Sequence, residues 1–130
     1  MKKILSLLLI CLAVVACTNT FEAAVALANE KCAGKDLGNG ATVKSVSLDK
    51  DFLVYDVEWN DAYNEVQVCN EHPEIQEQMK TEMLNAFKAD PDSKELIELC
   101  TKQNKGIKYV YMSINSGDIL ELVIKAEDLK

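Results

Sequence analysis

The stretch Phe52-Leu53-Val54-Tyr55-Asp56-Val57-Glu58-Trp59 decides how this chain folds. Its odd-numbered residues are all apolar or aromatic, while Asp56 and Glu58 lie between them, which is the two-residue period of a strand with one covered face. Residues 41–48 predict a preceding strand, and Asp49-Lys50-Asp51 between the two has the composition of a tight turn. We therefore expect an antiparallel hairpin here.

A second hairpin is predicted near the end of the sequence. Residues 107–114 and 118–125 predict two strands, and Asn115-Ser116-Gly117 predicts the turn that joins them. Residues 60–70, which follow the first hairpin, are ambiguous: Asp61 could cap a short helix there, or the segment could be an irregular crossover.

About three helices are predicted from apolar residues that recur at helical spacing. Residues 21–32, rich in alanine, form the first. The second begins with Pro73, which suits the first turn of a helix. The third is capped by Asp92 or Ser93, and Gly106 is the expected stop at its C-terminal end.

The order of these elements predicts the fold class. A helix, a hairpin, two helices and a second hairpin indicate a single α+β domain over residues 21–130. Strands joined by tight turns are antiparallel, so we expect a four-stranded antiparallel sheet made of two hairpins, with the helices packed on one face.

The first residues have the composition of an export signal. Met1-Lys2-Lys3 is positively charged, and residues 4–15 carry no charge. Twelve residues suit the core of a signal peptide and fall short of the roughly 20 needed to span a bilayer. The run ends in Val14-Val15-Ala16-Cys17, which resembles the lipobox of bacterial lipoproteins. The resemblance implies cleavage before Cys17 and lipid on its thiol, and two or more acyl chains make a stable anchor.

The resulting division is a signal peptide at residues 1–16, a lipidated tether at 17–20, and the folded domain. The alternative is an ordinary secretory signal cleaved near the same place, which would release a soluble periplasmic protein. Thr18 is not the aspartate that retains enteric lipoproteins at the inner membrane. The expected location is therefore the cell envelope, with the anchor in the outer membrane and the domain facing the periplasm.

The charge of the mature chain limits its partners. Residues 17–130 contain 12 lysines, no arginine and 21 acidic residues, a side-chain charge of −9. Arginine is the residue of choice for bidentate phosphate contacts, so this chain is not expected to bind nucleic acid. The expected partners are the membrane, through the lipid on Cys17, and an unidentified protein or small ligand; a basic partner is the easier to accommodate.

Three cysteines remain after Cys11 leaves with the signal and Cys17 takes lipid. Cys32, Cys69 and Cys100 would lie in an oxidising compartment, where disulfides form. Three thiols allow one bridge, and we expect it between Cys32 and Cys100, with Cys69 as the alternative partner. The other possibility is three buried reduced cysteines that pack as small apolar residues.

No catalytic, cofactor-binding or metal-binding site is predicted. Cys69 and His72 have the spacing of a zinc-ligand pair, but a closed structural site needs four ligands. The same two residues could be a thiol nucleophile and its base. The simpler interpretation is an exposed histidine beside Pro73 and a buried cysteine. There is no phosphate-binding glycine loop and no nucleophile elbow, so we do not expect an enzyme.

The aromatic residues allow two interpretations. They could form a platform for sugar or peptide on an open face of the sheet, or they could pack beneath the helices, which must cover one face. The residues concerned are Tyr55, Trp59, Tyr109 and Tyr111.

Several short motifs resemble a known group of proteins. They are Cys32, Tyr55-Asp56-Val57, Met79-Lys80, Glu95-Leu96-Ile97-Glu98-Leu99-Cys100, Gly106-Ile107-Lys108-Tyr109-Val110-Tyr111, Ser116-Gly117-Asp118 and Glu127-Asp128-Leu129. Their layout resembles small, uncharacterised lipoproteins of Bacteroides-like bacteria, which implies export and implies no activity. The leading hypothesis is a membrane-anchored envelope lipoprotein that acts as a non-catalytic binding or accessory module. The alternative is an acidic periplasmic inhibitor of a cationic enzyme such as lysozyme.

Overall fold

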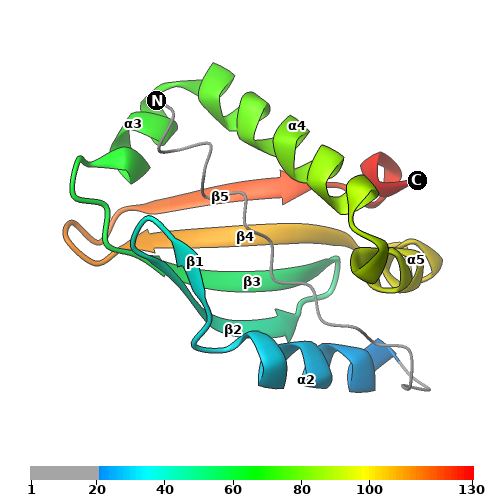
Figure 1. Cartoon of the computed structure of the whole chain (residues 1–130). Helices are drawn as coiled ribbons and strands as arrows, with labels where there is room; N and C mark the ends of the chain where they lie inside the picture. The colour runs from blue at the N-terminus through cyan, green and yellow to red at the C-terminus, as the bar shows by residue number, and fades with distance from the viewer. Residues whose placement is uncertain (1–20) are drawn as a thin grey trace.

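The computed structural model describes residues 21–130, which form an α+β domain (Figure 1). Its elements are α2 (Phe21–Cys32), β1 (Asp36–Gly38), β2 (Ala41–Leu48), β3 (Phe52–Trp59), α3 (Glu65–Glu71), α4 (Pro73–Ala89), the 3-10 turn η2 (Pro91–Ser93), α5 (Lys94–Lys102), β4 (Gly106–Ser113), β5 (Ile119–Ile124) and the 3-10 turn η3 (Ala126–Leu129). Among these residues, no helix is long and apolar enough to cross a membrane. The predicted signal peptide and Cys17 lie outside the described residues.

The sheet is mixed, which corrects the expected all-antiparallel sheet. Its strands lie in the order β1-β2-β3-β4-β5. The two predicted hairpins, β2–β3 and β4–β5, are confirmed as antiparallel pairs. However, β3 and β4 pair in parallel, from Phe52 opposite Gly106 to Trp59 opposite Ser113. The reason is the long helical crossover between them, which returns the chain to the end of the sheet where β3 began.

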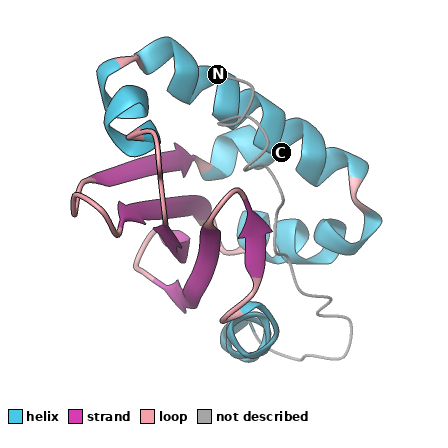
Figure 2. Cartoon of the chain, turned by 60° about the vertical axis from the view of Figure 1, so that its left-hand side comes forward, coloured by secondary structure: helices cyan, strands magenta, loops and turns pink. Residues whose placement is uncertain are grey.

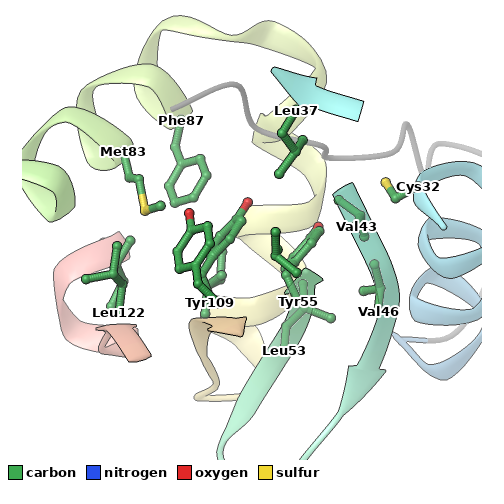
Figure 3. Packing of buried hydrophobic residues seen from close by; sticks show 14 of the residues in the cluster. Cys32, Leu37, Val43, Val46, Leu53, Tyr55, Met83, Phe87, Tyr109 and Leu122 are labelled. Carbon is green, nitrogen blue, oxygen red and sulfur yellow. The ribbon is translucent and has the colours of Figure 1, made fainter. Parts of the chain in front are cut away.

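A fifth strand was not predicted. This strand, β1, has three residues, Asp36–Gly38, and pairs with β2. It lies in a glycine-rich segment whose composition is typical of a turn. Its middle residue, Leu37, is buried and lies above Tyr55 in the core (Figure 3). The segment after β3 is settled as a short helix, α3, and Pro73 is confirmed in the first turn of α4.

The helices lie on one face of the sheet and leave the other face open, as expected, but the described residues form four helices where about three were predicted (Figure 2). Met83 and Phe87 of α4 lie above Leu122 and Tyr109 of the sheet (Figure 3). The four aromatic residues in question are at most 1% exposed, so they belong to the core and form no platform on the open face: Tyr55, Trp59, Tyr109 and Tyr111. Of the two interpretations of these residues, packing beneath the helices is therefore the correct one.

Gly106 does not end α5, which corrects a second expectation. Asn104, at φ 54°, adopts the left-handed conformation that closes the helix. Its N–H donates to the carbonyl of Thr101 (3.1 Å), and the N–H of Lys105 donates to the carbonyl of Cys100 (2.8 Å), the two bonds of a Schellman motif. Gly106 is instead the first residue of β4, where a Cβ atom would lie 2.3 Å from the carbonyl oxygen of Ile124.

Candidate functional site

The candidate ligand site is a pocket of about 400 Å³ at the end of the domain where α4 turns into α5. We call it the α4–α5 pocket. It is lined by Leu84, Phe87, Lys88, Ala89, Asp90, Pro91, Lys94, Ile97, Glu98 and Leu129. Its volume falls in the range of about 300–1,000 Å³ that small-molecule sites occupy.

The pocket follows from how the chain leaves α4. Pro91 cannot continue a helix, so α4 ends at Ala89 and the chain reverses through η2 into α5. The hydroxyl of Ser93 donates to the carboxylate of Asp90 (2.8 Å), which holds this turn. Residues of both helices then line the pocket, together with Leu129 of η3.

The wall of the pocket is apolar and its rim is charged. Phe87 and Leu129 are buried, while Leu84 and Ile97 are partly exposed and pack against the core. Lys88, Lys94 and Glu98 are exposed at the rim, and none of the three makes an ion pair within the described part of the chain. An apolar wall with a few polar groups that can orient a ligand is the usual design of a binding site.

The sequence analysis did not predict this pocket, because it used the lysines only to work out net charge. One signal was present: Lys94 lies in the first turn of α5, where the positive end of the helix dipole disfavours a cation. The partial exposure of Ile97 could not be foreseen, because it depends on how far α4 and η3 lie from α5.

The open face of the sheet is the second surface of interest. A hollow there is lined by Lys44, Ser45, Asp56, Val57, Glu58, Val110, Met112 and Ile119. Met112 is 39% and Ile119 is 53% exposed. Lys44 pairs with Glu58 (Nζ to Oε1, 3.3 Å), and Ser45 donates to Asp56 (3.1 Å). These polar groups satisfy one another, so the α4–α5 pocket offers more unpaired charge to a ligand.

One carboxylate is buried, and its contacts show a structural role. Asp61 is 2% exposed and lies between β3 and α3. Its Oδ1 accepts from the hydroxyl of Ser113 and from Nδ2 of Asn115 (3.2 Å), and its Oδ2 accepts from the N–H of Val66 (3.1 Å). Asp61 thus joins the start of α3 to the β4–β5 turn, as a capping residue would.

Three tyrosine hydroxyls lie in the core without a hydrogen-bond partner among the described residues: those of Tyr55, Tyr109 and Tyr111. The rings of Tyr55 and Tyr109 stack at 4.8 Å between centroids with an interplanar angle of 6°, and those of Tyr109 and Tyr111 lie 6.1 Å apart. Burial raises the pKa of all three phenols well above its ordinary value of 10. The three side chains are therefore neutral at physiological pH.

The cysteines differ from the predicted pairing. Cys69 and Cys100 are buried free thiols, so the expected bridge of Cys32 with Cys100, and the alternative with Cys69, are both wrong. Figure 1 shows why for Cys100: the first turn of α2 lies nearer to α5, and Cys32 is at the other end of this 12-residue helix, about 18 Å long. A disulfide needs Cα atoms within about 7 Å.

Cys32 is nevertheless disulfide-bonded. Its partner is neither Cys69 nor Cys100, because both of these are free thiols.

The buried thiols are unreactive. Burial raises the pKa of Cys69 to about 11, and the nearby charge of Glu65 acts in the same direction. Burial raises the pKa of Cys100 to about 12, although Lys105 opposes the shift. The thiolate is the reactive form of cysteine, so neither residue has the environment of a nucleophile.

Cys69 and His72 do not form a joint site. The thiol of Cys69 faces the core and lies 3.8 Å from the sulfur of Met79. His72 is exposed, and its Nδ1 lies 3.0 Å from the carboxylate of Glu74. Within residues 21–130, no group of three or more histidine, cysteine or acidic side chains is placed to hold a metal ion.

The comparisons with known proteins identify a fold and no family. No known family and no curated protein matches the sequence. The fold is similar to the crystal structure of a provisionally assigned secreted protein from Pseudomonas aeruginosa, with a TM-score of 0.61. The match covers 85% of this chain and 93% of that chain at 4% sequence identity. At this identity the likeness shows the α+β fold alone.

Proposed function

We propose that this protein is an exported envelope lipoprotein, anchored by lipid on Cys17, and that its domain is a non-catalytic binding module with the α4–α5 pocket as its ligand site. The observation that carries the proposal is the pocket: a volume of about 400 Å³ with an apolar wall and a charged rim. The anchor rests on the lipobox-like run Val14-Val15-Ala16-Cys17.

The environment of the buried reactive groups supports a non-catalytic role. Cys69 and Cys100 are held protonated by burial. Both oxygens of Asp61 are engaged in hydrogen bonds. None of these three residues lines the α4–α5 pocket, whose polar groups are lysines and carboxylates at the rim. Charged groups at a rim can orient a bound ligand.

The location follows from the anchor. Domain residues begin with Phe21 at the start of α2, so a tether of only residues 17–20 would separate the fold from the lipid. Because residue 18 is threonine, the proposed membrane is the outer one, with the domain facing the periplasm.

Metabolic labelling tests the anchor. Cells that express the protein receive an alkyne-bearing palmitate, and the protein is then isolated and coupled to a dye. The expected result is label on wild type and on Cys11→Ala, which alters only the signal peptide, and no label on Cys17→Ala. An unlabelled wild-type chain would refute the proposed anchor and would favour a soluble periplasmic protein.

A second candidate function is inhibition of a cationic enzyme such as lysozyme. The charge of −9 on the mature chain favours it, because opposite charges steer association and raise its rate. A panel of lysozymes assayed with added protein at low and high salt tests this candidate. Inhibition that weakens as salt rises supports it, and activity that is unchanged at every salt concentration rules it out.

A further inference from the structure

Two opposite charges on α5 face the same ligand space without neutralising each other. Lys94 and Glu98 are four residues apart, so they project from the same side of the helix. Both line the α4–α5 pocket, yet they make no ion pair with each other. Lysine placed before glutamate is the less favourable order for such a pair, which leaves both groups open to a ligand.

The rim therefore offers a cation and an anion side by side. Lys88, at the end of α4, adds a second cation on the opposite wall and is also without an ion pair in residues 21–130. Asp90 adds a second carboxylate, so the lining carries two positive and two negative side chains. A ligand with one charge would meet repulsion as well as attraction, whereas a zwitterion would meet a complementary group for each charge.

The apolar wall limits the rest of the ligand. Leu84, Phe87, Ile97 and Leu129 are the large aliphatic and aromatic residues that line this space of about 400 Å³. At roughly 30 Å³ for each water-sized group, this space holds about a dozen heavy atoms. That is the size of one large apolar amino acid.

We propose, on the basis of the proposed binding function of this pocket, that it takes a free apolar α-amino acid in its zwitterionic form. The carboxylate of the ligand binds Lys94, with Lys88 as a second donor. Its ammonium group binds Glu98, and its side chain packs against Leu84 and Ile97. The two charges of an α-amino acid lie close together, and Lys94 and Glu98 are neighbours on one face of α5.

Isothermal titration with three related compounds tests the inference. The full chain, purified from membranes in a non-ionic detergent, is titrated with L-phenylalanine, with N-acetyl-L-phenylalanine, which lacks the ammonium, and with L-phenylalanine amide, which lacks the carboxylate. Each exposed charge pair is worth up to about 1 kcal/mol, so each blocked compound should bind about fivefold more weakly.

Variants connect each charge to one residue. Glu98→Gln should weaken binding of phenylalanine about fivefold and leave binding of the N-acetyl compound unchanged. Lys94→Gln should weaken the binding of phenylalanine and leave the binding of phenylalanine amide unchanged. Glu95→Gln and Lys102→Gln are matched controls on the same helix, because neither residue lines the pocket. Leu84→Trp fills the space and should abolish binding of all three compounds.

The outcomes separate this inference from the proposed function. If all three compounds bind equally and only Leu84→Trp removes them, the amino-acid inference is overturned while an apolar ligand site survives. If no compound binds and the wild-type protein is folded, both the inference and the assignment of this pocket are overturned. The inference is supported if wild type binds phenylalanine more tightly than either blocked compound. The difference from the N-acetyl compound should disappear in Glu98→Gln, and the difference from the amide should disappear in Lys94→Gln.

Discussion

Removing a single buried hydroxyl should make this domain more stable. Tyr109 is 1% exposed, and its hydroxyl has no hydrogen-bond partner among the described residues. Burying such a group without a partner costs about 1–3 kcal/mol in protein mutational data. Tyr109→Phe deletes the hydroxyl and keeps the ring that stacks on Tyr55 at 4.8 Å. We therefore expect the free energy of unfolding to rise by about 1–3 kcal/mol.

Urea unfolding followed by the fluorescence of Trp59, the single tryptophan, measures this change. With a denaturant slope of about 1.5 kcal/mol/M, the midpoint should move up by about 0.7–2 M at an unchanged slope. Tyr63→Phe is the matched control, because Tyr63 is 69% exposed and its substitution should shift stability by less than about 0.5 kcal/mol. A midpoint that falls by 0.5 M or more in Tyr109→Phe would refute the reasoning, since it would mean that the hydroxyl is bonded.

Three further predictions concern the buried groups. With a pKa of about 11, only about one thousandth of Cys69 is thiolate at pH 8. Iodoacetamide should therefore react slowly with Cys69 and Cys100 in native protein and readily with both in denatured protein. Rapid labelling of native protein would contradict this prediction. The pKa values of the two buried thiols and three buried phenols are raised in the folded state. In the unfolded chain the same thiols lose their protons above about pH 9 and the phenols above about pH 10, so high pH favours unfolding. The urea midpoint should therefore be level up to about pH 8.5 and then fall as pH rises; a constant midpoint through pH 11 would count against the burial of these groups. Asp61→Ala leaves buried donors, including Ser113, without an acceptor and should lower stability by about 3 kcal/mol, whereas a change below about 1 kcal/mol would show that the bonds are dispensable.

Local features of the fold could be predicted from sequence, because local patterns specify them. The alternation in Phe52–Trp59 and the turn at Asp49-Lys50-Asp51 define a hairpin whose two strands are neighbours in the chain. Pro73 likewise marks the start of α4 by its own geometry. In each case the residues that carry the signal are those that make the contacts.

Features that depend on distant contacts could not be predicted. β3 and β4 pair in parallel because a crossover of more than 40 residues brings the chain back to the end of the sheet where β3 began. The residue pattern within a strand carries no information about that return. The three residues of β1 are too few to show a period. The α4–α5 pocket is lined by residues far apart in the sequence, such as Phe87, Ile97 and Leu129, so it depends on how α4, α5 and η3 pack. The free thiol of Cys100 likewise depends on its distance from Cys32.

Intact mass of the protein from native membranes, with wild type beside Cys17→Ala, tests the central claim most directly. The anchored lipoprotein predicts a wild-type chain that begins at Cys17 and carries diacylglycerol and an acyl group, and it predicts that Cys17→Ala carries neither. The contradicting result is a wild-type chain that carries no lipid. That result would mean that the protein is exported without an anchor.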